Sequence, residues 1–120
     1  MKFKVYYYAN CNTCKKALNF LDKKGIDYET INIRDKPPTK KELRRMLEVV
    51  NGEAKRLFNT SSKDYKAQKL KDKIRLMSDQ EVIDLLASNG NLIRRPFVIG
   101  DSMCIVGYMR EIWETKFADN

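Results

Sequence analysis

Two cysteines three positions apart, Cys11 and Cys14, are the residues best suited to chemistry in this chain. They lie between an apolar run that favours a strand and a segment from Lys15 whose spacing favours a helix. The first amides of a helix have no intrahelical partners and its dipole is positive there, so a thiolate at Cys11 would be stabilised. We expect Cys11 to be the attacking sulfur. Cys14, one helical turn further in, would attack a mixed disulfide on Cys11 and release the product.

The chain contains no histidine, which excludes Cys-His and Ser-His catalytic pairs and imidazole metal ligands. A zinc site would need four ligands, and beyond Cys11 and Cys14 the sequence offers only Cys104 and carboxylates. Redox chemistry by the close pair is therefore favoured over metal binding, and no metal is expected. Cys104 lies in an apolar run and is expected to be a core residue.

The length of 120 residues is typical of one domain, and we expect residues 1–120 to form one. No apolar run approaches the roughly 20 residues of a membrane span. The first residues lead into a strand rather than a signal sequence, so a cytoplasmic protein without a membrane partner is expected. In a reducing compartment, a close pair of cysteines is more often catalytic or redox-sensing than structural.

The patterning predicts an α/β fold with the order strand, helix, strand, a mostly helical middle, two strands and a helix. Apolar spacing predicts the first helix over about Asn12 to Lys24, and alternation predicts a parallel strand over Asp27 to Ile33. Capping-box patterns at Thr39 to Glu42 and at Ser78 to Glu81 indicate two helix starts in the middle segment. The glycine of Asn51-Gly52 suits the end of the first of these helices.

This order, with Cys-x-x-Cys after the first strand, is typical of a thioredoxin or glutaredoxin fold. Within that class the chain resembles the arsenate reductase (ArsC) family and its relative Spx over nearly its whole length. The motifs that carry the resemblance are Tyr8 to Ala17, Pro37 to Thr39, Leu57 to Ser61, Leu86 to Pro96 and Gly107-Tyr108. The resemblance implies a small mixed sheet with flanking helices and a helical insertion over about residues 38–90.

The resemblance also implies a site. Cys11 matches the nucleophilic cysteine of the family, and Pro96 matches a cis-proline that faces it, with Arg95 beside an anion site. An oxyanion needs guanidinium forks and free amides at the helix start, which here belong to the Asn12 and Thr13 region. No bound cofactor is expected, and glutathione, a glutaredoxin or a thioredoxin is the expected thiol donor.

The chain departs from the pattern of efficient arsenate reductases, which carry three arginines around the anion. Only Arg95 matches, because Asn59 stands at the first position and Gly107-Tyr108 near the third. Lys55-Arg56 could reach the site, and Arg94 is expected to be solvated. A thiol-disulfide oxidoreductase with weak arsenate reduction at most is therefore the favoured interpretation, acting on a small thiol or oxyanion or on a redox-partner protein.

The alternative interpretation is a redox-sensing transcription regulator like Spx, which binds the RNA polymerase α subunit. Gly52 and Arg95 fall where that family contacts the polymerase, although Asn59 stands where Spx carries an arginine. The net charge of +8, with eight Lys and Arg between Lys55 and Arg75, raises a third possibility of nucleic-acid binding. No nucleic-acid-binding motif accompanies this charge. A solvated helical face that steers anionic partners is favoured instead.

Overall fold

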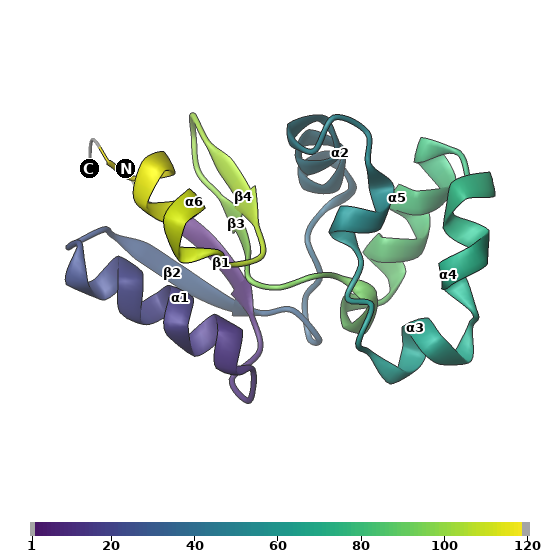
Figure 1. The fold of residues 1–120 in the computed structure, drawn as a ribbon, viewed down its shortest axis with the longest axis horizontal. Helices are drawn as coiled ribbons and strands as arrows, with labels where there is room; N and C mark the ends of the chain where they lie inside the picture. The colour runs from purple at the N-terminus through teal and green to yellow at the C-terminus, as the bar shows by residue number, and fades with distance from the viewer. Residues whose placement is uncertain (1, 119–120) are drawn as a thin grey trace.

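One four-stranded sheet, in the order β2-β1-β3-β4, organises the computed structural model, which describes residues 2–118 (Figure 1). β1 (Phe3–Tyr7) runs parallel to β2 (Tyr28–Asn32) and antiparallel to β3 (Phe97–Ile99). β3 pairs antiparallel with β4 (Cys104–Val106). The parallel strands are joined by α1 (Asn12–Lys23), because a parallel pair needs a crossover connection. This mixed sheet with flanking helices confirms the predicted fold class.

The segment between β2 and β3 is mostly helical, as predicted, and residues 40–92 are called the helical insertion below. Its α-helices are α2 (Lys40–Val49), α3 (Lys63–Ala67), α4 (Leu70–Lys73) and α5 (Asp79–Ser88). Three short 3-10 helices accompany them: η1 (Ala54–Leu57) lies between α2 and α3, η2 (Ile74–Leu76) between α4 and α5, and η3 (Gly90–Leu92) after α5. Both predicted capping boxes are formed, at the starts of α2 and α5. None of the helices in residues 2–118 is long and apolar enough to cross a membrane.

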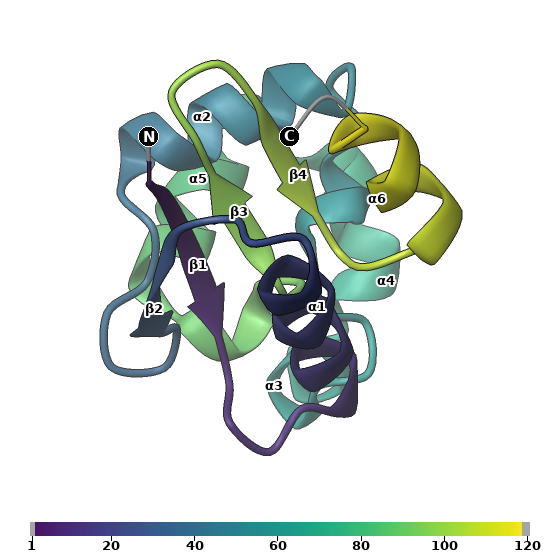
Figure 2. The same cartoon turned by 90° about the vertical axis from the view of Figure 1, so that its left-hand side faces the viewer.

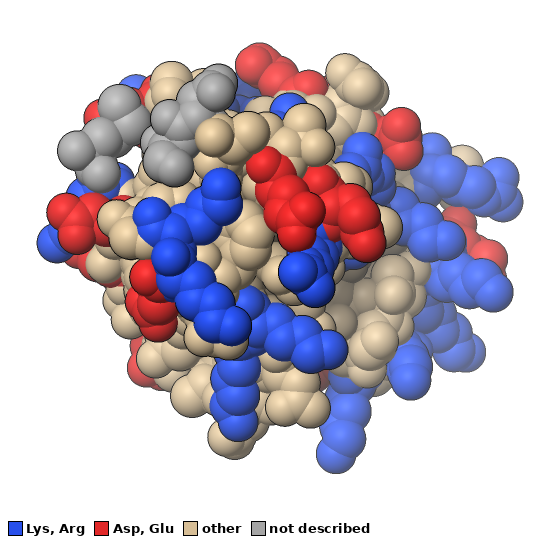
Figure 3. Space-filling view, turned by 60° about the vertical axis from the view of Figure 1, so that its left-hand side comes forward, with Lys and Arg blue, Asp and Glu red and all other residues tan. Residues whose placement is uncertain are grey.

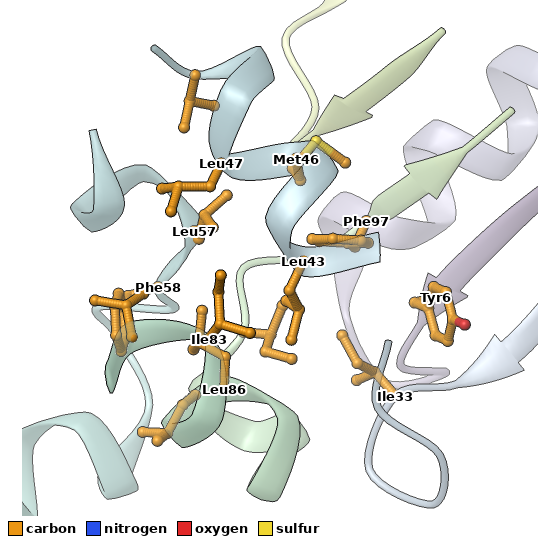
Figure 4. Packing of buried hydrophobic residues seen from close by; sticks show 14 of the residues in the cluster. Tyr6, Ile33, Leu43, Met46, Leu47, Leu57, Phe58, Ile83, Leu86 and Phe97 are labelled. Atoms are coloured by element: carbon orange, nitrogen blue, oxygen red, sulfur yellow. The ribbon is translucent and has the colours of Figure 1, made fainter. Parts of the chain in front are cut away.

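Side chains alternate along the strands, so the sheet buries apolar residues on both faces. Phe3 and Val5 pack on one face against α1 and against α6 (Arg110–Lys116), where Trp113 is fully buried. Tyr6 and Phe97 belong to the core on the opposite face, which the helical insertion covers (Figure 4). Figure 2 shows α1 and α6 in front of the sheet with the insertion behind it. The insertion is therefore packed on the sheet through its own apolar layer.

Glu42 on α2 ties the insertion to β1. Its carboxylate accepts a hydrogen bond of 2.7 Å from the Tyr6 hydroxyl and forms an ion pair with Lys4. It also accepts from the Thr39 backbone amide within the capping box. Burial alone would raise the pKa of Glu42, but the bonds from Lys4, Thr39 and Tyr6 together lower it below its usual value. The carboxylate is thus held in its charged form at the edge of the core.

Gly90 sets how closely the end of the insertion approaches the sheet. A Cβ atom at Gly90 would lie 1.8 Å from the Ile33 carbonyl oxygen, just beyond β2. Only glycine permits this contact, because backbone cannot move aside as a side chain can. Gly90 begins η3, and the chain then continues to Arg94 and Arg95. The close approach therefore positions the segment that carries these arginines.

We expect Gly90→Ala to lower the free energy of unfolding by about 3 kcal/mol, the upper end of the usual cost of forcing atoms into a packed site. Gly25→Ala is the matched control, since a Cβ there meets nothing within 4 Å and suffers only the strain of a φ of +69°. That strain costs about 1–2 kcal/mol. Urea unfolding of both variants measures the difference. Equal losses of stability would show that Gly90 is not a close contact.

Candidate functional site

Cys11 caps the N-terminus of α1. β1 ends at Tyr7, and the Cys11 backbone amide donates to the Tyr8 carbonyl at 3.0 Å as the chain turns into the helix. The Cys14 backbone amide donates to the Cys11 Sγ at 3.4 Å, which is the role that a Ser, Thr or Asp oxygen usually fills at this position. An amide directed at the sulfur stabilises a thiolate there. The predicted place of Cys11, between strand and helix, is confirmed.

Cys14 is buried on the inner face of α1 with 1% of its surface exposed. Burial is the main cause that raises the pKa of Cys14 to about 12, and contact with the Cys11 sulfur raises it further, whereas the Arg95 charge acts to lower it. Cys104 lies in the core as expected, and burial raises the pKa of this thiol too. Of the three cysteines, Cys11 alone is partly exposed.

A cleft of about 850 Å³ opens beside the Cys11 sulfur and is called the thiol cleft below. Cys11 and Thr13 line it from the start of α1, and residues from two further segments complete its walls. One segment runs through η1 to Ser61, and the other is Arg94-Arg95. The structure thus brings Cys11, Thr13 and Arg95 together, as predicted, around a single space.

Arg95 presents an unsatisfied donor beside this cleft. Its Nη1 atom is buried without a hydrogen-bond partner among the described residues, and its guanidinium lies 5.3 Å from the centre of the Tyr8 ring. The guanidinium of Arg34 lies 3.8 Å from the centre of the same ring, and Arg34 also donates a hydrogen bond of 3.0 Å to the Tyr8 hydroxyl. Leaving a buried guanidinium donor unpaired is costly. An anionic ligand in the cleft would remove that cost.

The peptide bond between Arg95 and Pro96 is cis, which confirms the prediction from the resemblance. Pro96 is buried, and its carbonyl accepts from the Gly107 amide at 2.8 Å. A Cβ atom at Gly107 would lie 2.6 Å from the Nε atom of Arg94, so the Arg94 guanidinium fills the space beside this glycine. Arg94 is half-buried and lines the cleft, contrary to the expectation of a solvated residue. The sequence pattern near Gly107 therefore did not predict that the Arg94 guanidinium would lie beside this glycine.

Positive charge dominates the thiol cleft. Lys55 and Arg56 line it from η1, in addition to Arg94 and Arg95, while Glu53 is the one carboxylate among the lining residues that the structure describes. Arg95 is the one arginine that matches the family pattern, yet the cleft is lined by three further cations. Matching by position does not detect these cations, because their side chains reach the cleft from other positions of the sequence.

Four of the predicted site residues do not line the thiol cleft: Asn12, Cys14, Gly52 and Pro96. Asn12 is exposed at the first position of α1 and does not line the cleft. Gly52 lies exposed beyond the end of α2 with a φ of +78°, beside a separate hollow that includes Arg44 and Leu47. Within residues 2–118, no group of three or more Cys, Asp or Glu side chains is placed to hold a metal ion.

Comparison with known protein families agrees with the resemblance that the sequence motifs indicate. The model of the ArsC family matches residues 6–115 of the chain. The chain belongs to the ArsC family. The family match spans Cys11, Arg95 and Gly107, and so includes the whole thiol cleft.

Three relatives illustrate the range of the ArsC family. YusI of Bacillus subtilis is 36% identical over 118 residues, which cover 98% of this chain and all of that protein. The global transcriptional regulator Spx of Streptococcus pyogenes is 30% identical over 104 residues, covering 87% of this chain and 76% of the regulator. The crystal structure of a possible arsenate reductase from Streptococcus mutans is 37% identical, with a TM-score of 0.84, covering 93% of this chain and 97% of the other. Similarity therefore extends to a transcriptional regulator and to a possible arsenate reductase.

We expect iodoacetamide to modify Cys11 at least about a hundredfold faster than Cys14 or Cys104 at neutral pH, because the thiolate reacts and burial keeps the other two protonated. Mass spectrometry of each cysteine peptide against time and pH gives the three rates. In denaturant the three rates should converge, which controls for intrinsic reactivity. Faster modification of Cys14 or Cys104 in the folded protein would contradict the assignment of Cys11.

Proposed function

We propose that the chain is a thiol-disulfide oxidoreductase with Cys11 as nucleophile and Cys14 as resolving cysteine. The observation that carries the proposal is the pairing of a partly exposed sulfur, capped by a helix amide, with a buried thiol one turn further on. Such a pair separates the two tasks of a dithiol reductant. The accessible sulfur attacks the substrate, and the protected thiol reacts only with what is bound to its neighbour.

The reaction is balanced within the pair and its substrate. The Cys11 thiolate attacks one sulfur of a substrate disulfide, so the Cys11 to substrate bond forms and the other substrate sulfur leaves as a thiolate that takes up a proton. The Cys14 thiol then loses its proton and attacks the Cys11 sulfur, which forms the Cys11 to Cys14 disulfide and releases the second substrate thiol. Two electrons pass from the pair to the substrate. Glutathione, a glutaredoxin or a thioredoxin would return them.

The order of the two steps follows from the electrostatics of Cys14. While Cys11 is a free thiolate, its hydrogen bond and its charge help to keep the pKa of Cys14 high. Once Cys11 is bonded to substrate, that contribution is gone. The Arg95 charge, which lowers the pKa of Cys14, then acts against burial alone. Loss of the Cys11 contribution thus lowers the pKa of Cys14 from its value in the free pair, while burial still raises it.

Arg95 and the start of α1 are the proposed anion contacts of the reaction. The free Nη1 donor of Arg95 suits a carboxylate or oxyanion carried by the substrate or by the thiol donor. The amides at Asn12 and Thr13 supply the helix N-terminus, and Pro96 follows Arg95 through a cis peptide bond. The cytoplasm, where thiols are kept reduced, suits this chemistry. Arsenate is expected to be a weak substrate beside a disulfide.

In a single turnover without added thiol, the reduced wild-type protein should release both thiols of a disulfide substrate. Cys14→Ser should release one thiol and keep the other on Cys11, because no second sulfur is present to resolve the bond. Cys11→Ser should react at least about a hundredfold more slowly, since it lacks the exposed thiolate. Thiol titration and intact mass measure each outcome, with Cys104→Ser as the control that behaves as wild type. Release of both thiols by Cys14→Ser would refute its role.

A second candidate function is an Spx-like regulator that binds the RNA polymerase α subunit. The observations that favour it are the 30% identity to Spx and the exposure of Gly52, the position that the resemblance assigns to polymerase contact. A Cβ atom at Gly52 meets nothing within 4 Å, so the surface around it is open. In this function the Cys11 and Cys14 pair would act as a switch and not as a catalyst.

For the regulator, Gly52→Arg should abolish binding to the C-terminal domain of the α subunit without changing the alkylation rate of Cys11. Gly25→Arg is a matched control, because Gly25 has a similar φ of +69°, equally open surroundings and the same change of charge. A binding titration of wild type and both variants decides the point. We expect no polymerase binding by the wild type. Binding that is lost in Gly52→Arg and kept in Gly25→Arg would favour the regulator over the enzyme.

A further inference from the structure

A second hollow adjoins the thiol cleft on the helical insertion. It has a volume of about 490 Å³ and is called the lysine pocket below. Six of its lining residues are Lys55, Thr60, Tyr65, Lys66, Lys69 and Lys71. In Figure 3, positively charged side chains crowd the right-hand side of the molecule and few acidic ones lie among them. Four of the residues that line the pocket are lysines and one is an aspartate, so its lining carries net positive charge.

Tyr65 gives the lysine pocket an unsatisfied polar group. Its side chain is 5% exposed, its ring packs against Phe58, and its hydroxyl is buried without a hydrogen-bond partner among the described residues. A phenylalanine would fill the same apolar space without that cost. An acceptor that arrives with a ligand would remove this cost.

The lysines of the pocket are not neutralised by the protein. Within residues 2–118, none of Lys55, Lys66, Lys69 and Lys71 forms an ion pair, and Asp72 is the one carboxylate in the lining. Lys69 is also held at a φ of +53°, a backbone conformation that costs free energy for a residue with a side chain. Unpaired like charges beside an unpaired hydroxyl donor fit a ligand that supplies negatively charged oxygen atoms.

The lysine pocket and the thiol cleft are adjacent, because Lys55 and Thr60 line both hollows. A bound polypeptide that contacts Lys55 and Thr60 therefore lies at the border of the two hollows. In the thiol cleft itself, the buried Nη1 of Arg95 is a second donor without a partner among the described residues.

We propose that the lysine pocket binds carboxylates of an acidic polypeptide segment whose disulfide sulfur reacts at Cys11. The inference rests on the proposed function and names its substrate class: a protein disulfide flanked by Asp or Glu. Carboxylates would pair with the lysines and the Tyr65 hydroxyl, and the shared lining by Lys55 and Thr60 puts the acidic segment next to the cleft that Cys11 lines. Nucleic acid would satisfy the charge but brings no sulfur for Cys11 to attack.

The test uses Cys14→Ser protein and two short peptides, each with one cysteine activated as a 2-thiopyridyl disulfide. One peptide carries three Glu beside the cysteine and the other carries three Gln. Attack by Cys11 joins it to the peptide sulfur and releases 2-thiopyridone, whose absorbance gives the rate. At low salt the Glu peptide should react about tenfold faster, as expected for electrostatic attraction into a positive cleft. Equal rates for the two peptides would overturn the proposal.

Variants of the protein then show which residues cause the difference in rate between the two peptides. Lys66→Gln with Lys71→Gln should bring the ratio of the two rates close to one, whereas Lys36→Gln with Lys41→Gln, which removes the same charge from exposed positions outside both hollows, should leave it near wild type. Tyr65→Phe should lower the rate with the Glu peptide and leave the rate with the Gln peptide unchanged. Equal loss of preference in the two double variants would mean that net charge, and not the pocket, selects the peptide.

A binding measurement separates failure of the inference from failure of the proposed function. If neither peptide reacts, the oxidoreductase function fails, and binding of peptides with Ser in place of Cys still tests the pocket. We expect the Glu peptide to shift the backbone amide NMR signals of residues 63–73, and the Gln peptide to leave them unchanged. The absence of such shifts would overturn the inference. So would a random-sequence DNA duplex that shifts the same signals at lower concentration than the Glu peptide.

Discussion

A hydrogen bond from the Cys14 amide to the Cys11 sulfur joins the chemistry of the site to the packing of the fold. It exists because the helix begins at Asn12, and the rotation of that helix is set by Ala17 and Leu21, which are fully buried against the sheet on the same face as Cys14. A shift of one residue would turn each side chain by about 100° around the helix axis. Core packing therefore decides which sulfur is buried and which faces the cleft.

The opposite wall of the cleft is held by pairing between a segment of the helical insertion and the chain that follows the insertion. Phe58 forms an isolated bridge with Ile93, the Asn59 amide donates to the Leu92 carbonyl at 2.7 Å, and the Arg94 amide donates to the Leu57 carbonyl at 2.8 Å. These bonds tie the chain that follows η1 to the chain that precedes β3. The cations of η1 and the two arginines consequently form one wall, which Gly90 fixes against the sheet.

Much of the fold follows from signals within a few residues of one another. The Cys11 cap, the capping boxes that begin α2 and α5 and the glycine after α2 are local patterns, and the structure contains each of them. The place of Arg94 was not predictable in the same way, since it depends on a glycine thirteen positions later leaving room for a guanidinium. The contact of Tyr8 with Arg34 and Arg95 likewise joins three distant segments and has no signature in spacing.

The absence of histidine shapes how this site must work. No imidazole is present to remove a proton from Cys11, so in the proposed reaction fixed amides and positive charge would have to favour its thiolate. The cations around the cleft differ in burial. Arg95 is half-buried and its Nη1 atom is shielded from solvent, whereas Lys55 and Arg56 are exposed and act within a Debye length of about 8 Å at physiological ionic strength. Salt therefore weakens the attraction of an anion by Lys55 and Arg56 more than it weakens an interaction at the Arg95 Nη1 atom.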